Sequence, residues 1–259
     1  MYVSPRYDHP DAHNVYDVPY FEYSLLAQWP NRKTFEKRLD LLERNGPTKG
    51  RLLDVGCSVG QFMEIARERG WEPHGVDITD HFADRIRRRA GVSIRVGDFL
   101  HVPCESASFD AVHMGDSIEH MLDPAAVIRK VCDILKPGGV GYVRAPDCGH
   151  IAPRLFGRRW IQIKPDEHLY YFNRRTMRRM LEAAGLTVLV CRSSRAYFTV
   201  ETFSSRVGFY YPAARCAAGL LIAAARAIGV DRARFPVDLL EEFEILFRKP
   251  AERTGTGGP

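Results

Sequence analysis

The chain has 259 residues, 45% of them hydrophobic and 27% charged, which is ordinary for one large globular domain with insertions. The formal net charge is only +5, and acidic residues are interspersed among the arginines, so the charge gives little support for nucleic-acid binding. The sequence contains no run of about 18 apolar residues, which excludes a membrane-spanning helix of ordinary length.

The six cysteines are scattered and form no Cys-x-x-Cys pair. The first 20 residues are polar and aromatic and lack the apolar core of a signal peptide. Free thiols in a reducing compartment are the simplest interpretation, because structural disulfides belong to oxidising ones. We therefore expect a cytoplasmic protein.

The N-terminal residues 1–30 are rich in Tyr, Pro, His and Asp. Such a segment cannot form a core alone, but it could cover a site on one, and Tyr16 and Tyr20 are candidates for contact with a substrate. A helix is expected over residues 32–44, because apolar residues lie along one face of it and Gly46 followed by proline ends it. Residues 1–48 are assigned as an N-terminal cover segment and helix.

The stretch 51–63 predicts a strand over 52–55, a tight glycine turn and a helix over 61–69. Gly56 and Gly60 let a ligand approach the backbone closely, because they carry no side chain. The N-terminus of the following helix offers unpaired N–H groups to an anion.

The glycine spacing in this loop separates two classes of ligand. The dinucleotide fingerprint Gly-x-Gly-x-x-Gly is broken because position 58 is Ser58. Asp54 would repel a diphosphate, but it could accept hydrogen bonds from an ammonium group. A ligand with both a carboxylate and an ammonium group, such as S-adenosylmethionine, fits better, although a glycine turn can also serve packing alone.

Strands and helices alternate through the rest of the core. Helices are expected over 80–89, 124–135 and 174–184, and the strands over 52–55, 72–76, 93–96, 111–114, 140–144, 186–192 and 242–248. This alternation predicts an α/β fold with a Rossmann-like, seven-stranded, mostly parallel sheet that is covered by helices on both faces. Ligands then bind outside the C-terminal ends of the strands.

The C-terminal part departs from this alternation. We assign residues 49–195 and the last strand, within 239–250, to the core, and residues 196–238 to a helical insertion. An Ala-rich stretch over 213–230 is expected to pack on the domain as a helix, with a lid or a dimer surface as the alternatives. Residues 251–259 have the composition of a disordered tail.

Taken together, these residues resemble the class I S-adenosylmethionine-dependent methyltransferases, over about residues 51–195 and the last strand. The resemblance implies that Asp54 lies near the methionine ammonium, that Asp77 binds both ribose hydroxyls and that Asp98 accepts a hydrogen bond from the adenine amino group. It also implies that Ile78 and Phe99 sandwich the adenine ring. The other cofactor contacts that it implies are Gly56, Cys57 and Gly60 in the loop and Gly115 after the fourth strand.

A closer resemblance rests on three motifs, Ser117 to Pro124, Leu135 to Gly139 and Glu167 to Phe172. They are similar to a branch that includes ubiquinone-type O-methyltransferases and many sugar or natural-product methyltransferases. The resemblance implies methyl transfer to a hydroxyl group of a small molecule, in a natural product, a sugar or a quinone-like acceptor. It does not reach the N-terminal segment or residues 196–238, so it leaves the acceptor open.

Methyl transfer to a hydroxyl group requires a base, and histidine is the usual one near neutral pH. His168 and His120 are the candidates, with Glu119 beside the latter, and we prefer His168 because it lies in a long aromatic segment. Either histidine could instead hold the neighbouring loops together. Trp160 and Tyr170 are expected to shape the substrate pocket.

A metal is not assigned, although Glu119, Asp116 and a histidine could hold a divalent ion that binds a diol. An N-methyltransferase and a cofactor-binding partner protein without catalysis are the rival functions. A nucleic-acid methyltransferase is disfavoured, because the fourth strand does not end in the Pro-Pro-aromatic motif that amino methylation of bases usually shows. We expect a small-molecule acceptor, no nucleic acid and no membrane span, and a homodimer is an open alternative.

Overall fold

The computed structural model describes residues 32–47, 49–80, 83–84, 92–165, 167–194, 196–210, 212–231, 233–237 and 242–251. The predictions for Tyr16, Tyr20 and the tail, and for most of the helix expected over 80–89, therefore lie outside the described residues. Everything that follows concerns the described part of the chain.

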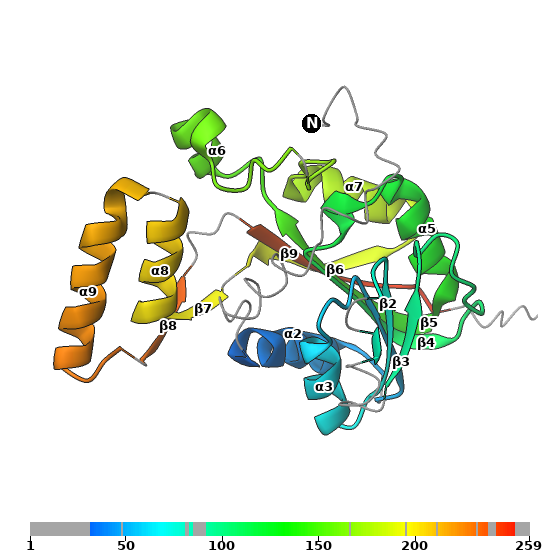
Figure 1. Ribbon diagram of the computed structural model, residues 1–259. Coiled ribbons are helices and arrows are strands. Elements are labelled where there is room, and N and C mark those ends of the chain that lie inside the picture. The colour runs from blue at the N-terminus through cyan, green and yellow to red at the C-terminus, as the bar shows by residue number, and fades with distance from the viewer. Residues whose placement is uncertain are drawn as a thin grey trace, which may run out of the picture.

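The centre of the molecule is a seven-stranded sheet with the strand order β3-β2-β1-β4-β5-β9-β6 (Figure 1). The strands β1 to β5 pair in parallel, whereas β9 runs antiparallel between β5 and β6. Their bounds are β1 (Arg51–Val55), β2 (Glu72–Asp77), β3 (Ser93–Val96), β4 (Phe109–Gly115), β5 (Leu135–Pro146), β6 (Thr187–Ser193) and β9 (Glu242–Arg248). The expected Rossmann-like, mostly parallel sheet is confirmed.

Both faces of the sheet are buried, because successive side chains of a strand point to opposite faces. Leu52 packs in one core cluster with the helices α2 (Arg32–Asn45) and α3 (Gln61–Glu68), and Leu53 packs in the other. The second cluster lies under α5 (Pro124–Ile134) and α7 (Arg174–Ala183). Figure 1 shows α2 and α3 together on one side of the sheet and α5 and α7 on the other.

Helix boundaries follow local capping chemistry. The side chain of Asp123 accepts the backbone N–H of Ala126 at the start of α5. Asn173 and Thr176 form a reciprocal capping box at the start of α7. These caps fix where α5 and α7 begin. They therefore set the lengths of the two segments that follow β4 and β5 at the carboxyl edge of the sheet.

The strand β5 begins earlier than expected. The turn expected over residues 136–139 lies inside the bounds of β5 as an irregularity, because β5 advances from Leu135 to Val140 while β4 advances only from Phe109 to Ala111. The ammonium of Lys136 binds both oxygens of Asp110, and the backbone of Gly138 and Gly139 pairs with Lys249. These contacts hold the turn in place, and Gly138 adopts a φ of 80° in it.

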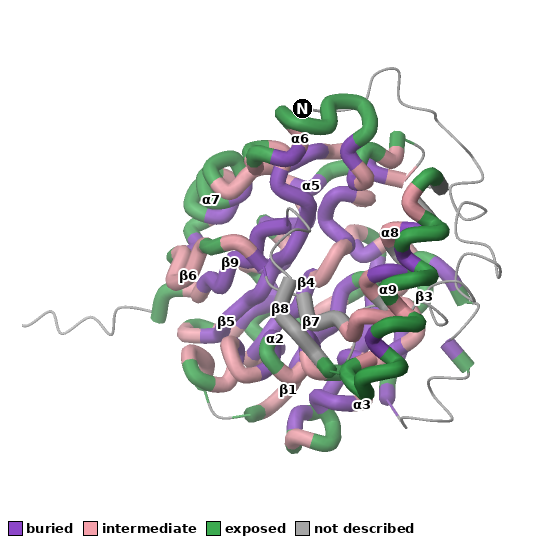
Figure 2. Tube along the Cα trace, turned by 90° about the vertical axis from the view of Figure 1, so that its left-hand side faces the viewer, coloured by how far each residue is buried: buried purple, intermediate pink, exposed green. Residues whose placement is uncertain are grey.

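The insertion before β9 is a helical hairpin on a small sheet. The strands β7 (Ala196–Thr199) and β8 (Arg234–Val237) pair with each other, and between them lie α8 (Val200–Tyr210), the 3-10 turn η4 (Pro212–Ala214) and α9 (Arg215–Ala227). The main neighbour of α9 is α8. Much of the surface of α9 is exposed (Figure 2), and Leu220 on it is 74% exposed, whereas Ala218 and Ala225 are buried. The role of this helix, packed on the domain, as a lid or as a dimer surface, stays a prediction.

The segments that border the carboxyl edge are short. The 3-10 turn η2 (Ile118–His120) follows β4, and α6 (Ile151–Phe156) and η3 (Gly157–Arg159) follow β5. In the part of the chain that the structure describes, no helix has the length and apolar character needed to cross a membrane.

Candidate active site

The loop after β1 has the backbone of a close-approach ligand site. Gly56 and Gly60 lie at φ values of 78° and 77°, and Ser58 between them lies at 46°, in the left-handed region that glycine adopts without strain. A Cβ on Gly56 would come within 2.7 Å of the Cβ of Ser117, so the loop lies directly against the segment after β4. No side chain caps the N-terminus of α3, which leaves its first N–H groups to a ligand.

Asp77, at the end of β2, is bound into this loop. One carboxylate oxygen accepts the backbone N–H of Ser58 at 2.7 Å, and the other accepts the N–H and the hydroxyl of Thr79. Burial raises the pKa of Asp77, and the N–H groups of Thr79 and Ser58 oppose that rise. Three protein donors already occupy three of the four lone pairs, so the carboxylate keeps one for a ribose hydroxyl, and a second ribose hydroxyl would have to replace the hydroxyl of Thr79.

The carboxylate of Asp54 is buried, and its place near the methionine ammonium, which the resemblance implies, stays a prediction. Asp54 is 3% exposed, and its carboxylate lies 2.7 Å from Nδ1 of His113 on β4. The ring of His113 is stacked between Phe62 and Tyr142. Asp54 therefore lies beneath the loop and contributes negative charge from below.

The residues expected around adenine are divided between the surface and the core. Asp98 accepts the N–H of Leu100 and lies 3.1 Å from His101, so it shapes the turn after β3. Ile78 is 38% exposed, but Phe99 is 4% exposed and belongs to the core cluster under α5. The expectation that the ring of Phe99 faces adenine disagrees with this placement, because the ring packs inward.

Two further residues expected at the cofactor act through their backbone. The thiol of Cys57 is buried, which raises its pKa, while its N–H binds the carbonyl of Val76. Gly115 has no room for a side chain, because a Cβ there would come within 2.3 Å of Nη1 of Arg38. Both positions shape the floor of the site.

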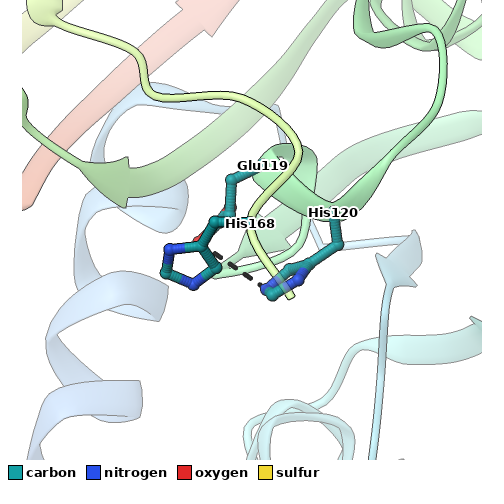
Figure 3. Close-up of side chains that lie close together, drawn as sticks. All are labelled: Glu119, His120 and His168. Carbon is teal, nitrogen blue, oxygen red and sulfur yellow. Dashed lines mark ion pairs between the residues drawn. The ribbon is translucent and has the colours of Figure 1, made fainter. Parts of the chain in front are cut away.

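The three residues expected to be catalytic, Glu119, His120 and His168, lie together (Figure 3). Each offers an atom within 4.8 Å of the others. The two imidazole rings are edge to face at 4.9 Å, and Nε2 of His120 lies 3.9 Å from Oε1 of Glu119. The carbonyl of Glu119 accepts the N–H groups of Leu169 and Tyr170, which joins the segment after β4 to the one after β5.

Hydrogen bonds orient both histidine rings. Nδ1 of His168 lies 2.9 Å from the carbonyl of Gln162, and Nδ1 of His120 lies 2.8 Å from the carbonyl of Glu167. A carbonyl only accepts, so each Nδ1 carries the proton and each Nε2 is the basic atom.

Burial sets the charge state of the cluster. It lowers the pKa of His168 to about 3, with further lowering from His120 and Lys164. Burial also lowers the pKa of His120, and burial together with the charge of Asp116 raises the pKa of Glu119 well above its usual value. Both rings are therefore neutral at pH 7, and Oε2 of Glu119 is buried with no hydrogen-bond partner in the described residues.

Two imidazole nitrogens and a carboxylate oxygen are also the donor set of many divalent transition-metal sites. The sequence placed Asp116 in such a set. In the structure Asp116 is instead bound by Arg38 and Arg144, and the second histidine takes its place beside Glu119.

The aromatic side chains expected to line the substrate pocket pack against neighbouring side chains. Trp160 is buried against Ala152 and Tyr171, and its indole Nε1 has no hydrogen-bond partner in the described residues. Tyr170 donates its hydroxyl to the carbonyl of Leu122 and stacks on Phe172. They therefore support the wall around His168 in this conformation.

Sequence reasoning missed a group of buried charged residues beside the cluster, namely Arg38, His113, Arg144 and Glu242. Arg144 binds Asp116 with one guanidinium nitrogen, Glu242 with the other and the hydroxyl of Ser194 with Nε. The available signal was a charged or polar residue inside an otherwise apolar strand, as with His113 in β4 and Arg144 in β5.

Comparison with known proteins agrees with this geometry. Residues 27–190 match the model of a family described as a methyltransferase domain. The ubiquinone biosynthesis O-methyltransferase of Idiomarina loihiensis is 32% identical over 132 residues, which cover 45% of this chain and 54% of that protein. The enzyme of the same name from Ralstonia nicotianae is 33% identical over 112 residues, 39% of this chain and 46% of that protein. The chain thus spans about half the length of these curated relatives.

Solved structures share the fold. Phosphoethanolamine N-methyltransferase 2 of Haemonchus contortus, solved with phosphomonomethylethanolamine and S-adenosylhomocysteine, has a TM-score of 0.60 at 20% identity, covering 90% of this chain and 57% of that one. A SAM-dependent methyltransferase from Thermotoga maritima has a TM-score of 0.58 at 17% identity, covering 89% and 95%. The family model matches well over half of the residues, and the chain therefore belongs to the methyltransferase domain family.

Proposed function

We propose that this protein transfers the methyl group of S-adenosylmethionine to a hydroxyl group of a small molecule. The observation that carries the proposal is the contact between Gly56 and Ser117. It joins the glycine loop to the segment that bears Glu119 and His120, so a cofactor site and a cluster of acid–base groups share one edge of the sheet.

The residues of the loop fit the cofactor. The uncapped N-terminus of α3 would receive the methionine carboxylate, and Asp77 would accept a ribose hydroxyl on the oxygen that also accepts the N–H of Ser58. The hydroxyl of Ser117 is buried and has no partner in the described residues, and it lies beside Gly56 where a bound ligand would contact it. The turn of Asp98 with the exposed Ile78 would border the adenine.

The cofactor supplies an electrophilic methyl group on a sulfonium that is already a good leaving group. The protein has to align the hydroxyl and accept its proton. The atom that accepts this proton is Nε2 of His168. Nδ1 donates to the carbonyl of Gln162, which holds the ring in the tautomer that leaves Nε2 unprotonated. The products are a methyl ether, S-adenosylhomocysteine and a proton that leaves through the imidazole.

Glu119 has a second role in this proposal. Burial raises the pKa of Glu119 and so favours its protonated form, in which the buried, unpartnered carboxyl oxygen can donate a hydrogen bond to the acceptor. A hydroxyl group with an oxygen beside it, as in a diol or a catechol, would meet both His168 and Glu119. The curated relatives named ubiquinone biosynthesis O-methyltransferases support an acceptor of this kind.

The test is an acceptor screen with methyl-labelled S-adenosylmethionine, read by mass spectrometry. The panel contains catechols, quinol precursors, sugars and their amino analogues. Labelled methyl on oxygen, lost in His168→Gln, is the expected result. Labelled methyl only on nitrogen, with His168→Gln fully active, would replace the proposal by an N-methyltransferase. Activity that disappears with chelator and returns with a divalent ion would move the histidines from proton transfer to metal binding.

A further inference from the structure

The helix α2 reaches the carboxyl edge of the sheet through one side chain, Arg38. Its guanidinium is 2% exposed, and it lies over the rings of Phe35 and Tyr142. Nη1 lies 3.3 Å from Nε2 of His113, and Nη2 lies 3.2 Å from a carboxylate oxygen of Asp116. One cation therefore bridges a residue inside β4 and the residue that immediately follows this strand.

The sheet register explains why Arg38 meets His113. Asp54 on β1 pairs with His113 on β4, which pairs in turn with Tyr142 on β5. These three side chains form a row across neighbouring strands on the face that α2 covers. Gly115 leaves the space through which the guanidinium approaches, because a Cβ there would come within 2.3 Å of Nη1.

The donors of Arg38 fix the tautomer of His113. A guanidinium has only donors, so Nε2 of His113 must accept and Nδ1 must carry the proton. Nδ1 then donates to Asp54 at 2.7 Å. Burial lowers the pKa of His113, which keeps the ring neutral, and the rings of Phe62 and Tyr142 clamp it from both sides. The carboxylate of Asp54 is thereby held in one orientation beneath the glycine loop.

On its other side Arg38 holds the segment that carries the acid–base cluster. Asp116 has a φ of 60°, a left-handed conformation that is strained for a residue with a side chain. Its carboxylate is bound by Arg38 and by Arg144. Ser117 and Glu119 follow directly, so the orientation of Asp116 determines how these two side chains approach the loop and the histidines.

The same connections continue to the candidate base. Arg144 also binds Glu242, which accepts a hydrogen bond from the side chain of Gln162 at 3.2 Å. The backbone carbonyl of Gln162 is the acceptor for Nδ1 of His168. A buried series of polar contacts thus runs from the strand below the cofactor loop to the residue that would take the proton.

We infer that Arg38 is a positioning residue that couples the cofactor half of the site to the acceptor half. We call the series Asp54, His113, Arg38 and Asp116 the polar chain. The inference rests on the proposed function for the identity of the two halves. Without the guanidinium, Nε2 of His113 loses its donor and Asp116 loses one of its two cations, so both halves of the site lose a fixed contact although neither ligand touches Arg38.

The test compares Arg38→Met, which keeps much of the side-chain length and removes the donors, with Arg69→Met. Arg69 also binds α2, through Asp40 at 3.0 Å and through Glu43, but it lies outside the polar chain. Arg38→Met should weaken the binding of S-adenosylhomocysteine about tenfold and lower kcat at saturating cofactor by about 10- to 100-fold, the scale of a misplaced site. Arg69→Met should lose thermal stability and keep both values within about twofold.

A third measurement, of the protonation state of His113, requires no substrate. In the wild type, 15N chemical shifts of His113 should report a neutral ring protonated at Nδ1. In Arg38→Met the carboxylate of Asp54 still keeps Nδ1 protonated, and Nε2 should take up the second proton at a higher pH than in the wild type, because the guanidinium charge that lowers the pKa of His113 is gone. Arg38→Lys keeps one charge but cannot reach both partners in the same way, and it should fall between the wild type and Arg38→Met. If Arg38→Met fails to fold, Arg38→Lys and the wild-type tautomer decide the question.

Two results would overturn the inference. One is a wild-type His113 protonated at Nε2, and the other is an Arg38 variant that matches Arg69→Met in affinity and kcat. A wild type that binds no S-adenosylhomocysteine would instead refute the proposed function, and the tautomer measurement would still test the polar chain alone.

Discussion

The imidazole of His168 is neutral across the physiological pH range, because burial lowers its pKa to about 3. A general base works in its neutral form, so protonation does not remove it from use above that pKa. A histidine base with an ordinary pKa would give a rate that rises with pH through its ionisation near neutral pH. The structure predicts a rate that is flat near neutral pH and falls only in acid.

His168→Gln should lower the single-turnover rate by about 10²- to 10⁴-fold, the usual contribution of a general base. The cofactor affinity should stay unchanged, because the ring contacts the loop segments and not the glycine turn. His74→Gln is the control, since His74 lies on β2 beside Glu72 and Arg51. A His168→Gln rate close to that of His74→Gln would remove His168 from catalysis and direct the search to His120.

The buried histidines also predict how stability depends on pH. Burial lowers the pKa of His113, His120 and His168 from the ordinary histidine value of 6.5, so below that pH the unfolded chain binds more protons than the folded one. Their contribution to stability is complete above about pH 6.5 and is lost as the pH falls, with a limit of about 1.4 kcal/mol per pH unit for each proton.

The substitution His168→Gln removes one of these titrating groups, so a comparison with the wild type isolates the contribution of His168 to the pH dependence of stability. The variant should lose less stability than the wild type between about pH 6.5 and pH 4, measured by urea unfolding at each pH. Glu119, whose pKa is raised, acts in the opposite direction in both proteins and cancels in the comparison. Parallel curves for the two proteins would contradict the low pKa of His168.

Ser58 gives a prediction about backbone strain. Its φ of 46° costs a residue with a side chain about 1 kcal/mol, and its N–H must stay in place to bind Asp77. Ser58→Gly should keep cofactor affinity within about twofold, because the conformation is natural to glycine. Ser58→Val should weaken binding about tenfold or more, since a β-branched residue resists positive φ. Equal affinities of the two variants, measured by calorimetry, would contradict a role for this geometry.

At the scale of elements, the hairpin of α8 and α9 is separable from the sheet. Thr199 pairs with Arg234, so the two ends of the hairpin lie side by side on β7 and β8. Replacing residues 200–233 by a short Asn-Gly turn should preserve folding and cofactor binding. A lid is one of the roles that the sequence leaves open for this insertion, and on that role we expect acceptor turnover to fall at least about tenfold, because ordering such a cover contributes to alignment.

The hairpin replacement has two informative alternatives. Unchanged turnover would exclude the hairpin from the acceptor site. A fall in molecular mass by size-exclusion chromatography with light scattering would show that the exposed face of α9, with Leu220, is a dimer surface. A replacement protein that cannot bind cofactor would show that the hairpin supports the core itself.

Much of the element pattern could be predicted from sequence. β9 was predicted with its bounds, and the starts of α2, α3, α5 and α7 follow from capping and glycine signals. β5 was predicted too short because a Pro-Gly-Gly run normally ends pairing, whereas here Leu135 before the run still pairs with Phe109 of β4. α6 and the pair β7 and β8 were missed, because segments of four to six residues carry too few turns for a period to show.

At the scale of the whole molecule, only part of the site could be predicted from the sequence, because several of its contacts depend on the tertiary fold. His120, His168 and Glu119 were chosen by residue type and strand position, and the structure brings them together. Arg38 and His113 were not found, because these two residues are 75 positions apart in the sequence and their contact depends on the order of the strands. Asp54 and Phe99 were assigned correctly to strand ends, but the face to which each side chain points is a tertiary property.

The central claim is that the glycine loop and Asp77 form a pocket for S-adenosylmethionine. Calorimetric titration of the full chain with S-adenosylhomocysteine, with NAD as the comparison ligand, tests it most directly. We predict one bound S-adenosylhomocysteine per chain and no measurable NAD binding, and Asp77→Ala should weaken binding by about 1–3 kcal/mol, while Asp133→Asn, near the opposite edge of the sheet, should not. Tight NAD binding, or an S-adenosylhomocysteine affinity that is the same in Asp77→Ala as in the wild type, would contradict the account.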